Sequence, residues 1–222
     1  MRAALSIVIP TLNAESVLPA CLASLMPGVE AGLVREVVIA DGGSDDATQM
    51  IADEVGAIWV PGPAGRGGQL ARGVAAAGGD WLLVLHADAV LGEDWVAAVQ
   101  AGMAQGGPGY FRLRFRARGP GPRIVGVWAN LRARLGLPFG DQGLLVSRAD
   151  YEAAGGYRDI PLMEDMALAR ALARPRPLGA VIETGWTRYE GRWLRQGAGN
   201  IVRQIRFMLG ADPARLARSY RD

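Results

Sequence analysis

The sequence predicts an α/β fold, in which a Rossmann-like, mostly parallel sheet is flanked by helices in a single domain. Short apolar runs alternate with longer segments of helical periodicity through the first hundred residues, a pattern typical of parallel sheets covered by helices. A continuous apolar run at 81–85 is bounded by polar residues, as in a strand buried on both faces. No linker-like composition divides the 222 residues, so we expect one domain.

Four short apolar runs predict the strands of the first half, at residues 5–10, 36–40, 57–60 and 80–85. Turn-forming residues follow three of these runs, at 11–13, 41–46 and 61–63. A helix is expected after each turn: the first passes through Leu18, Leu22 and Leu25, the second begins near Ala47, and the third opens at 65–68 and runs through 74–77. Strand and helix therefore alternate in this half.

The second half is less regular. Apolar residues alternate with Arg112 and Arg114 at 110–115, which predicts a strand with one exposed face. Two further strands are expected at 143–146 and 181–183. Helices are expected at 124–135, 150–154, 163–173, 193–209 and 212–220, and the helix at 193–209 is basic and amphipathic.

Composition excludes several classes of protein. The net charge of +2 is too small for a nucleic-acid footprint, so no nucleic-acid partner is expected. All 24 basic residues are arginine, which excludes a P-loop, a kinase-type lysine and a Schiff base. Cys21 and His86 are the only cysteine and histidine, which argues against a disulfide or a zinc site. We find no signal peptide and no apolar run of about 20 residues, and expect a cytoplasmic protein.

The run at 81–85 ends at His86-Ala87-Asp88. Ligands of open α/β sheets bind beyond the carboxyl ends of the strands, so a carboxylate there can anchor Mg²⁺ or Mn²⁺ while the diphosphate of a nucleotide supplies further oxygens. His86 is a ligand only for a softer ion such as manganese, and a purely structural role is the more common one. The alternative for Asp88 is a cap on the helix expected after 93–95.

Two other acidic stretches lie at the ends of expected elements, where their carboxylates could bind a ligand or act in catalysis. Asp41 opens the turn at 41–46, where a carboxylate can accept hydrogen bonds from a ribose or a base, but a helix cap formed by Ser44 or Asp45 is the favoured alternative. Glu164 and Asp165 are adjacent, and one of them can serve as a general base. Because neighbouring side chains on a helix diverge, we expect at most one to face a given site. Compensation of the helix dipole is the alternative.

Arg66 lies in the glycine-rich stretch 65–68, after the third expected strand, and is a candidate contact for a diphosphate. The stretch does not fit a dinucleotide-binding fingerprint, because Leu70 stands where the third glycine belongs and the preceding strand is the wrong one. We therefore interpret it as a loop.

Taken together, residues 7–13 (Ile-Val-Ile-Pro-Thr-Leu-Asn), 41–48 (Asp-Gly-Gly-Ser-Asp-Asp-Ala-Thr), 85–88 (Leu-His-Ala-Asp) and 163–165 (Met-Glu-Asp) resemble family 2 glycosyltransferases in order and rough spacing. These are inverting enzymes with the A-type nucleotide-sugar fold. More narrowly, 86–88, 140–142 (Gly-Asp-Gln), 160–165 and 212–218 are similar to small bacterial members associated with radical-SAM and selenium-related gene neighbourhoods. The similarity covers nearly the whole chain.

The resemblance implies that a single sugar passes from a nucleoside-diphosphate sugar, with UDP the expected nucleotide, to an acceptor hydroxyl. It assigns about 1–105 to the donor half and about 106–222 to the acceptor half. The implied metal ligand is Asp88, with His86 as a candidate, and the implied catalytic base is Asp165, with Glu164 beside it. Nucleotide-sugar contacts would be Pro10, Thr11, Asn13, Glu15, Asp41, Arg66, Ala87 and Asp88. Acceptor-side residues would be Asp141, Gln142, Arg192 and Trp193.

The chain departs from the family pattern at three positions. His86 replaces the first aspartate of the Asp-x-Asp metal motif, and Gly42 replaces an aspartate that many relatives use to read the base. Tyr189 interrupts the Gln-x-x-Arg-Trp motif of processive synthases, so transfer of one sugar is expected rather than polymerisation.

The acceptor is expected to be an unidentified hydroxyl compound, and a lipid-linked one is a candidate. The C-terminal segment has a basic, partly apolar face that could rest on an anionic membrane, although packing of its apolar side on the core is the preferred interpretation. That face comprises Arg188, Arg192, Arg195, Ile201, Arg203, Ile205, Arg206 and Phe207.

Two other functions remain open. A sugar-phosphate nucleotidyltransferase would use a similar sheet and metal, but it usually carries arginine and lysine in an N-terminal glycine-rich loop, which this chain lacks. A non-catalytic nucleotide-sugar binding protein is the other alternative, because of His86.

Overall fold

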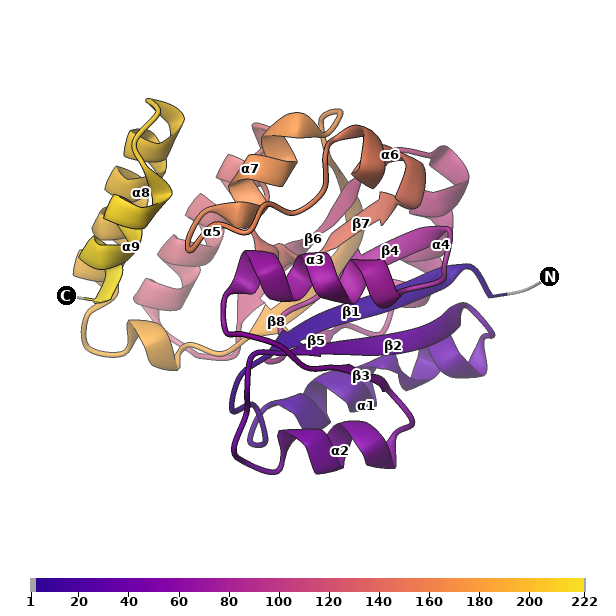
Figure 1. Cartoon of the computed structure of the whole chain (residues 1–222). Coiled ribbons are helices and arrows are strands. Elements are labelled where there is room, and N and C mark those ends of the chain that lie inside the picture. The colour runs from indigo at the N-terminus through magenta and orange to yellow at the C-terminus, as the bar shows by residue number, and fades with distance from the viewer. Residues whose placement is uncertain (1–2, 222) are drawn as a thin grey trace.

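The strands found within residues 3–221 belong to one sheet of eight strands, in the order β3-β2-β1-β4-β7-β6-β8-β5 (Figure 1). The computed structural model describes residues 3–221, and within them it leaves out the side chains of Arg188 and of 219–221. The strands are β1 (Leu5–Thr11), β2 (Val34–Asp41), β3 (Ile58–Val60), β4 (Trp81–Val84), β5 (Val90–Leu91), β6 (Gly109–Phe115), β7 (Leu144–Ser147) and β8 (Arg176–Thr184).

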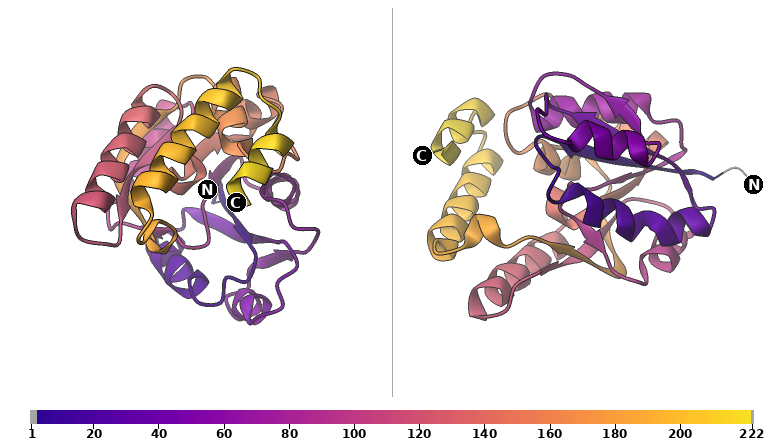
Figure 2. Two further views of the ribbon diagram at one scale, coloured as in Figure 1. Left: turned by 90° about the vertical axis from the view of Figure 1, so that its left-hand side faces the viewer. Right: turned by 90° about the horizontal axis from the view of Figure 1, so that it is seen from below.

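Helices cover both faces of the sheet (Figures 1 and 2). They are α1 (Leu18–Glu30), α2 (Thr48–Glu54), α3 (Arg66–Ala76), α4 (Trp95–Gln105), α5 (Pro120–Arg134), α6 (Arg148–Ala153), α7 (Glu164–Ala171), α8 (Trp193–Met208) and α9 (Pro213–Arg221). Two single-turn 3₁₀ helices, η1 (Gly140–Gln142) and η2 (Thr187–Tyr189), complete the set. None of the helices within residues 3–221 is both long and apolar enough to span a membrane. The predicted α/β architecture with a mostly parallel sheet is confirmed.

Strand β1 shows how sequence alternation builds the two halves of the core. Ile7 and Ile9 point to a cluster formed with α1, α2, α4 and α5, whereas Val8 joins a cluster formed with α3, α6 and α7. Successive side chains of a strand point to opposite faces of a sheet. A central strand must therefore be mostly apolar on both faces, as β4 is throughout and β1 is except at Ser6 and Thr11.

Strand directions determine where the functional residues gather. β1, β2, β3 and β4 are mutually parallel, β7 runs antiparallel to β4 and β6, and β8 is parallel to β6. The carboxyl ends of β1, β2, β4, β6 and β8 therefore share one edge of the sheet. Because β7 is reversed, its beginning also lies at that edge, directly after η1.

The structure corrects several sequence expectations. The two-residue strand β5, antiparallel to β8, was not predicted, because two residues carry no periodicity. Ser44 and Asp45 do not cap α2; the carboxylate of Asp46 instead accepts the backbone N–H of Thr48 at 2.9 Å. Asp88 does not cap α4 either, because its side chain turns towards β8.

The interpretation of α8 as a helix that packs its apolar side on the core is wrong. Among the described side chains of α8, only the polar Gln204 is buried, while Leu194 and Val202 are exposed. The helix lies at the rim of the molecule beside α5 and α9 (Figure 1). Arg188, which we assigned to the same basic face, lies outside the described side chains.

Candidate functional site

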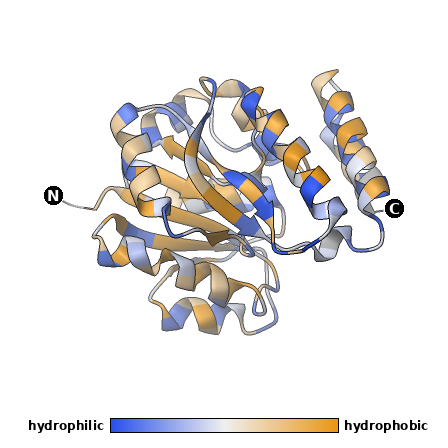
Figure 3. Cartoon of the chain, turned by 180° about the vertical axis from the view of Figure 1, so that it is seen from behind, coloured by the Kyte–Doolittle hydropathy of each residue, from blue (hydrophilic) through white to orange (hydrophobic). Residues whose placement is uncertain are grey.

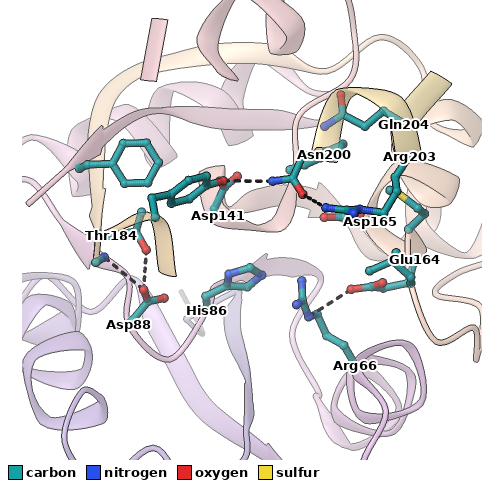
Figure 4. A pocket seen from close by; sticks show the side chains of 16 residues that line it. Arg66, His86, Asp88, Asp141, Glu164, Asp165, Thr184, Asn200, Arg203 and Gln204 are labelled. Carbon is teal, nitrogen blue, oxygen red and sulfur yellow. Dashed lines mark hydrogen bonds and ion pairs between the residues drawn. The ribbon is translucent and has the colours of Figure 1, made fainter. Parts of the chain in front are cut away.

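A pocket with a cavity volume of about 270 Å³ opens at the carboxyl edge of the sheet. Figure 4 shows its wall, to which the loop after β4, the strands β6 and β8, and the helices α3, α7 and α8 contribute. Six residues predicted from the sequence line it: Arg66, His86, Asp88, Asp141, Glu164 and Asp165. The sheet topology therefore brings together carboxylates that are up to 77 positions apart in the chain, at 88 and 165.

Asp88 follows β4 and is held from β8. Its Oδ2 accepts hydrogen bonds from the hydroxyl of Thr184 at 2.5 Å and from the backbone N–H of Gly185 at 3.2 Å. Burial alone would raise the pKa of Asp88, but the hydrogen bond from Thr184 and the charge of His86 outweigh it and hold the pKa below its usual range. The carboxylate is therefore kept ionised and oriented.

His86 lies between Asp88 and the turn η1. A Cβ atom at Gly140 would be 2.4 Å from Nε2 of His86, so the ring lies directly against the backbone of this glycine. The same glycine donates its backbone N–H to Oδ2 of Asp165 at 2.9 Å. The backbone of Gly140 therefore lies between the side chain of His86, after β4, and that of Asp165, in the first turn of α7.

Glu164 and Asp165 directly follow Met163, whose backbone adopts the left-handed conformation. Met163 has φ 69°, which ends the preceding loop sharply and starts α7 at Glu164. We expected that the two carboxylates would diverge and that at most one would face the site; this is wrong, because both line the pocket. They lie in the first turn, where no preceding turn of helix shields the second side chain.

Arg66 reaches Glu164 because glycines let α3 approach the loop before α7. A Cβ atom at Gly67 would be 2.1 Å from the backbone oxygen of Arg158, so only glycine permits this packing. Nε of Arg66 then lies 3.3 Å from Oε1 of Glu164. The glycine-rich stretch is therefore the first turn of a helix rather than a loop, and its glycines serve close packing.

Burial perturbs the carboxyl groups on the α7 side of the pocket. Burial, reinforced by the charge of Asp165 and opposed by Arg66, raises the pKa of Glu164 from 4.5 to about 7. Burial also raises the pKa of Asp141, although Arg132 opposes it. Oδ1 of Asp141 is buried and has no hydrogen-bond partner among the described residues. Such a group is expected to bind a polar ligand atom or to carry a proton.

Gln142, predicted on the acceptor side, is fully buried and does not line the pocket. Its Oε1 lies 3.3 Å from a guanidinium nitrogen of Arg132, and its Nε2 lies 3.4 Å from the backbone oxygen of Phe111. The guanidinium of Arg132 in turn stacks 3.5 Å from the centre of the Phe139 ring. Gln142 therefore anchors η1 from behind.

Five of the residues predicted to contact the nucleotide sugar lie at or just after the ends of β1 and β2, outside the pocket lining: Pro10, Thr11, Asn13, Glu15 and Asp41. Asp41 accepts hydrogen bonds from the hydroxyls of Thr11 and Ser44 at 2.8 and 2.6 Å, and from the backbone N–H groups of Gly43 and Ser44 at 2.7 Å each. These hydrogen bonds outweigh burial and hold the pKa of Asp41 below its usual range. The Asp41 carboxylate therefore fixes the loop after β2.

Asn13 and Glu15 join the two neighbouring loops. The side-chain oxygen of Asn13 accepts the backbone N–H of Asp45 at 3.0 Å, and a carboxylate oxygen of Glu15 accepts that of Ala47 at 3.0 Å. Of the other predicted residues, Pro10 pairs with β2 and Ala87 packs against the core. Arg192 is exposed before α8, and Trp193 packs at the start of α5.

Of the lining residues that were not predicted as site residues, the polar ones are Thr184, Tyr189, Asn200, Gln204 and Arg203, which we had placed only on the basic C-terminal face. Tyr189 stacks on Trp186 with ring centres 4.9 Å apart, and its hydroxyl accepts a hydrogen bond from the amide of Asn200 at 3.3 Å. The side-chain oxygen of Asn200 accepts one from Arg203 at 2.8 Å (Figure 4). The polar residues at 200, 203 and 204 recur at helical spacing, a signal that could have indicated a pocket-facing side of α8.

Asp88 and His86 could together hold a divalent cation, provided that water and phosphate oxygens supply most of its ligands. No cluster of three or more His, Cys, Asp or Glu side chains able to hold a metal is found in residues 3–221. A single ionised carboxylate with one oxygen facing the pocket suits Mg²⁺ or Mn²⁺, because these ions keep positions for water and phosphate oxygens. Asp88 meets this requirement, and the adjacent His86 could add a nitrogen ligand for Mn²⁺.

Comparisons with known sequences agree with the motifs. A PGL/p-HBAD biosynthesis glycosyltransferase of Mycobacterium bovis is 41% identical over 108 residues, which cover 43% of this chain and 40% of that protein. Glucosyl-3-phosphoglycerate synthase of Mycobacterium tuberculosis is 34% identical over 95 residues, which cover 39% of this chain and 29% of that protein. The aligned segments thus span less than half of these relatives.

Solved structures share the fold. The M. tuberculosis glucosyl-3-phosphoglycerate synthase in complex with Mn²⁺, UDP and phosphoglyceric acid superposes with a TM-score of 0.55 at 23% identity, over 90% of this chain and 77% of that one. Residues 1–349 of S. aureus TarS in complex with UDP give a TM-score of 0.59 at 15% identity, over 96% and 68%. The model of the family described as Glycosyl transferase family 2 matches residues 6–130, more than half of the 222 residues. The chain therefore belongs to glycosyl transferase family 2.

Proposed function

We propose that the protein transfers a single sugar from a UDP-sugar to an acceptor hydroxyl, with inversion at the anomeric carbon and with help from a divalent metal. The observation that carries this proposal is the pocket in which Asp88, from the end of β4, and Asp165, from the start of α7, line opposite sides (Figure 4). Inversion requires attack from the side opposite to the leaving diphosphate. A metal anchor and a base on opposite walls suit that geometry.

Asp88 is the proposed anchor for the metal and, through it, the diphosphate. Its hydrogen bonds from Thr184 and Gly185 orient the carboxylate and keep it ionised. A bound Mg²⁺ or Mn²⁺ would neutralise the charge that develops on the leaving diphosphate. Arg66, at the start of α3, supplies a further positive charge to the pocket, from a position beside Glu164.

Asp165 is the proposed base, which takes the proton from the acceptor hydroxyl as its oxygen attacks the anomeric carbon. Its two oxygens accept the backbone N–H groups of Gly140 and Met166, at 2.9 and 2.7 Å. These hydrogen bonds fix the carboxylate towards the pocket. The neighbouring Glu164 forms an ion pair with Arg66 and interacts electrostatically with Asp165.

The UDP nucleotide is proposed because the structures of glucosyl-3-phosphoglycerate synthase and TarS described above contain UDP. Pro10, Thr11, Asn13, Glu15 and Asp41 lie at the strand ends of the donor half, about 1–105, where a nucleoside could lie along the loops. Because the Asp41 carboxylate is occupied by protein hydrogen bonds, its contribution would be to hold those loops in shape.

The acceptor half, about 106–222, would bind the hydroxyl compound between Asp141, on η1, and α8. The buried Oδ1 of Asp141 is a partner for a substrate hydroxyl. Arg192 and Trp193 would lie further from the reacting centre. A lipid-linked acceptor and peripheral contact with the inner face of a membrane are part of the proposal. The narrower resemblance to members from radical-SAM and selenium-related neighbourhoods rests on the sequence motifs alone.

The test uses donor hydrolysis, in which water replaces the unidentified acceptor. UDP-glucose and other UDP-sugars would be incubated with the protein and MnCl₂, and release of UDP measured. The Asp165→Asn variant should hydrolyse the donor about 10²–10⁴ times more slowly, while it binds UDP with Mn²⁺ like the wild type. Asp53→Asn, at an exposed position of α2, is the matched control. Hydrolysis by Asp165→Asn at the wild-type rate would refute the assignment.

Two outcomes would support the other functions instead. Release of pyrophosphate from a nucleoside triphosphate and a sugar phosphate would indicate a nucleotidyltransferase. A rise in thermal stability with UDP and Mn²⁺, without hydrolysis or transfer of any UDP-sugar, would indicate a binding protein.

A further inference from the structure

Helix α5 carries an exposed apolar stripe. Ile124, Val127, Trp128, Leu131 and Leu135 recur at intervals of three and four residues, so they share one face of the helix and its C-terminal cap. They are 42–70% exposed, because the opposite face of α5 packs on β6. Large apolar side chains that line up in this way on a surface mark an interaction site more often than single exposed ones do.

Helix α8 extends this apolar surface. Its exposed apolar side chains, together with that of the following cap residue, are Leu194, Val202, Ile205, Met208 and Leu209. The two helices are in contact, and Trp193 packs where a Cβ atom of Gly121 would lie, 3.2 Å away. Figure 3 shows both helices side by side, with hydrophobic residues along their length. We call the ten apolar residues of the two helices the α5–α8 surface.

The charged residues of the two helices all have one sign. Neither α5 nor α8 contains an aspartate or a glutamate. The exposed charged side chains are Arg123 and Arg134 on α5 and Arg195 and Arg206 on α8. Apolar side chains on helices whose only charged residues are arginines complement the acyl and headgroup layers of an anionic bilayer, while the exposed Glu190 and Asp212 lie beyond the two ends of α8. The amphipathic ring of Trp128 suits the boundary between those layers.

We propose that the α5–α8 surface docks the protein on the surface of an anionic bilayer. The apolar side chains enter the boundary between headgroups and acyl chains, and the four arginines contact lipid phosphates. The opposite side of α8 contributes Asn200, Arg203 and Gln204 to the pocket. If the proposed transferase activity holds, docking therefore brings the pocket next to the layer in which a lipid-linked acceptor would lie.

The test measures vesicle binding by the full chain without substrates, so it is independent of the proposed activity. Phosphatidylcholine vesicles with and without phosphatidylglycerol are sedimented with the wild type and with the double variant Val127→Ser, Leu131→Ser. The matched control is Met50→Ser, Val55→Ser, which removes two apolar side chains of similar exposure at α2. Thermal unfolding and donor hydrolysis check that the variants are folded.

We expect the wild type and the control to bind vesicles that contain phosphatidylglycerol, less tightly at high salt. The Val127→Ser, Leu131→Ser variant should bind them about tenfold or more weakly, because two apolar side chains no longer enter the lipid. Failure of the wild type to bind anionic vesicles, or equal binding by that variant, would overturn the proposal. A wild-type dimer that the same two substitutions dissociate would also overturn it, because a second copy would then occupy the surface.

Discussion

Glu164 gives the most direct test of the electrostatics of the pocket. The side chain is buried, 2% exposed, and its carboxylate is paired with Arg66 and adjacent to Asp165. The perturbation is Glu164→Gln, which keeps the shape of the side chain and removes the titration. Because the pKa of Glu164 is raised by burial, folding makes this carboxyl harder to ionise. The free energy of unfolding must therefore change with pH.

The sign and size follow from the two pKa values. Below pH 4.5 the carboxyl is protonated in both the folded and the unfolded state, and its contribution to stability is fully present. Between pH 4.5 and about 7 only the unfolded state ionises readily, so stability falls as the pH rises. A shift from 4.5 to about 7, at about 1.4 kcal/mol per unit, corresponds to about 3 kcal/mol. The Gln variant lacks this loss.

The assay is urea unfolding of the wild type and of Glu164→Gln at several pH values from 4.5 to 8. The difference in unfolding free energy between the two proteins should move by about 3 kcal/mol in favour of the variant over this range. Glu54→Gln, at an exposed position of α2, is the control and should follow the pH dependence of the wild type. A difference between wild type and Glu164→Gln that stays constant with pH would refute the reasoning.

Two further substitutions test the contacts around the site. Thr184→Val removes the hydroxyl that donates a hydrogen bond to Asp88. It should weaken Mn²⁺-dependent UDP binding, measured by calorimetry, by about tenfold. An unchanged dissociation constant would contradict the proposed role of Asp88 as the anchor. Gly67→Ala puts a Cβ atom 2.1 Å from the backbone oxygen of Arg158 and should lower the free energy of unfolding by about 1–3 kcal/mol or more. Gly197→Ala, which meets nothing within 4 Å, should raise it by up to about 1 kcal/mol, and an equal effect of both would contradict the packing.

The strands of the first half could be predicted because burial on both faces demands continuous apolar runs, as at 81–85. The reversal of β7 could not, because the direction of a short apolar strand is decided by its neighbours, β4 and β6. Helix α8 shows a different limit. Its amphipathic pattern was recognised, but periodicity does not show which side faces the protein, and here the polar side does.

The site could be predicted in part. Asp88 was predicted to face the site because it follows a strong strand pattern, and Asp165 because two carboxylates begin a helix and match the family resemblance; both line the pocket, and their roles stay predictions. Thr184 carries no such signal, since its role depends on β8 crossing to lie beside β6. Asn13 and Glu15 were predicted to contact the nucleotide, whereas their side chains join two loops. The sequence cannot distinguish the two roles, because the same polar residue types serve both at strand ends.

The contact of His86 with the backbone of Gly140 limits how the pocket can vary. A side chain at position 140 would meet the His86 ring, because a Cβ atom there would lie 2.4 Å from Nε2, and the same residue holds Asp165 through its backbone N–H. Tyr189, Asn200 and Arg203 line other parts of the pocket, from η2 and α8. Exchange of these three side chains would therefore reshape the pocket without altering the contacts that Gly140 makes with His86 and Asp165.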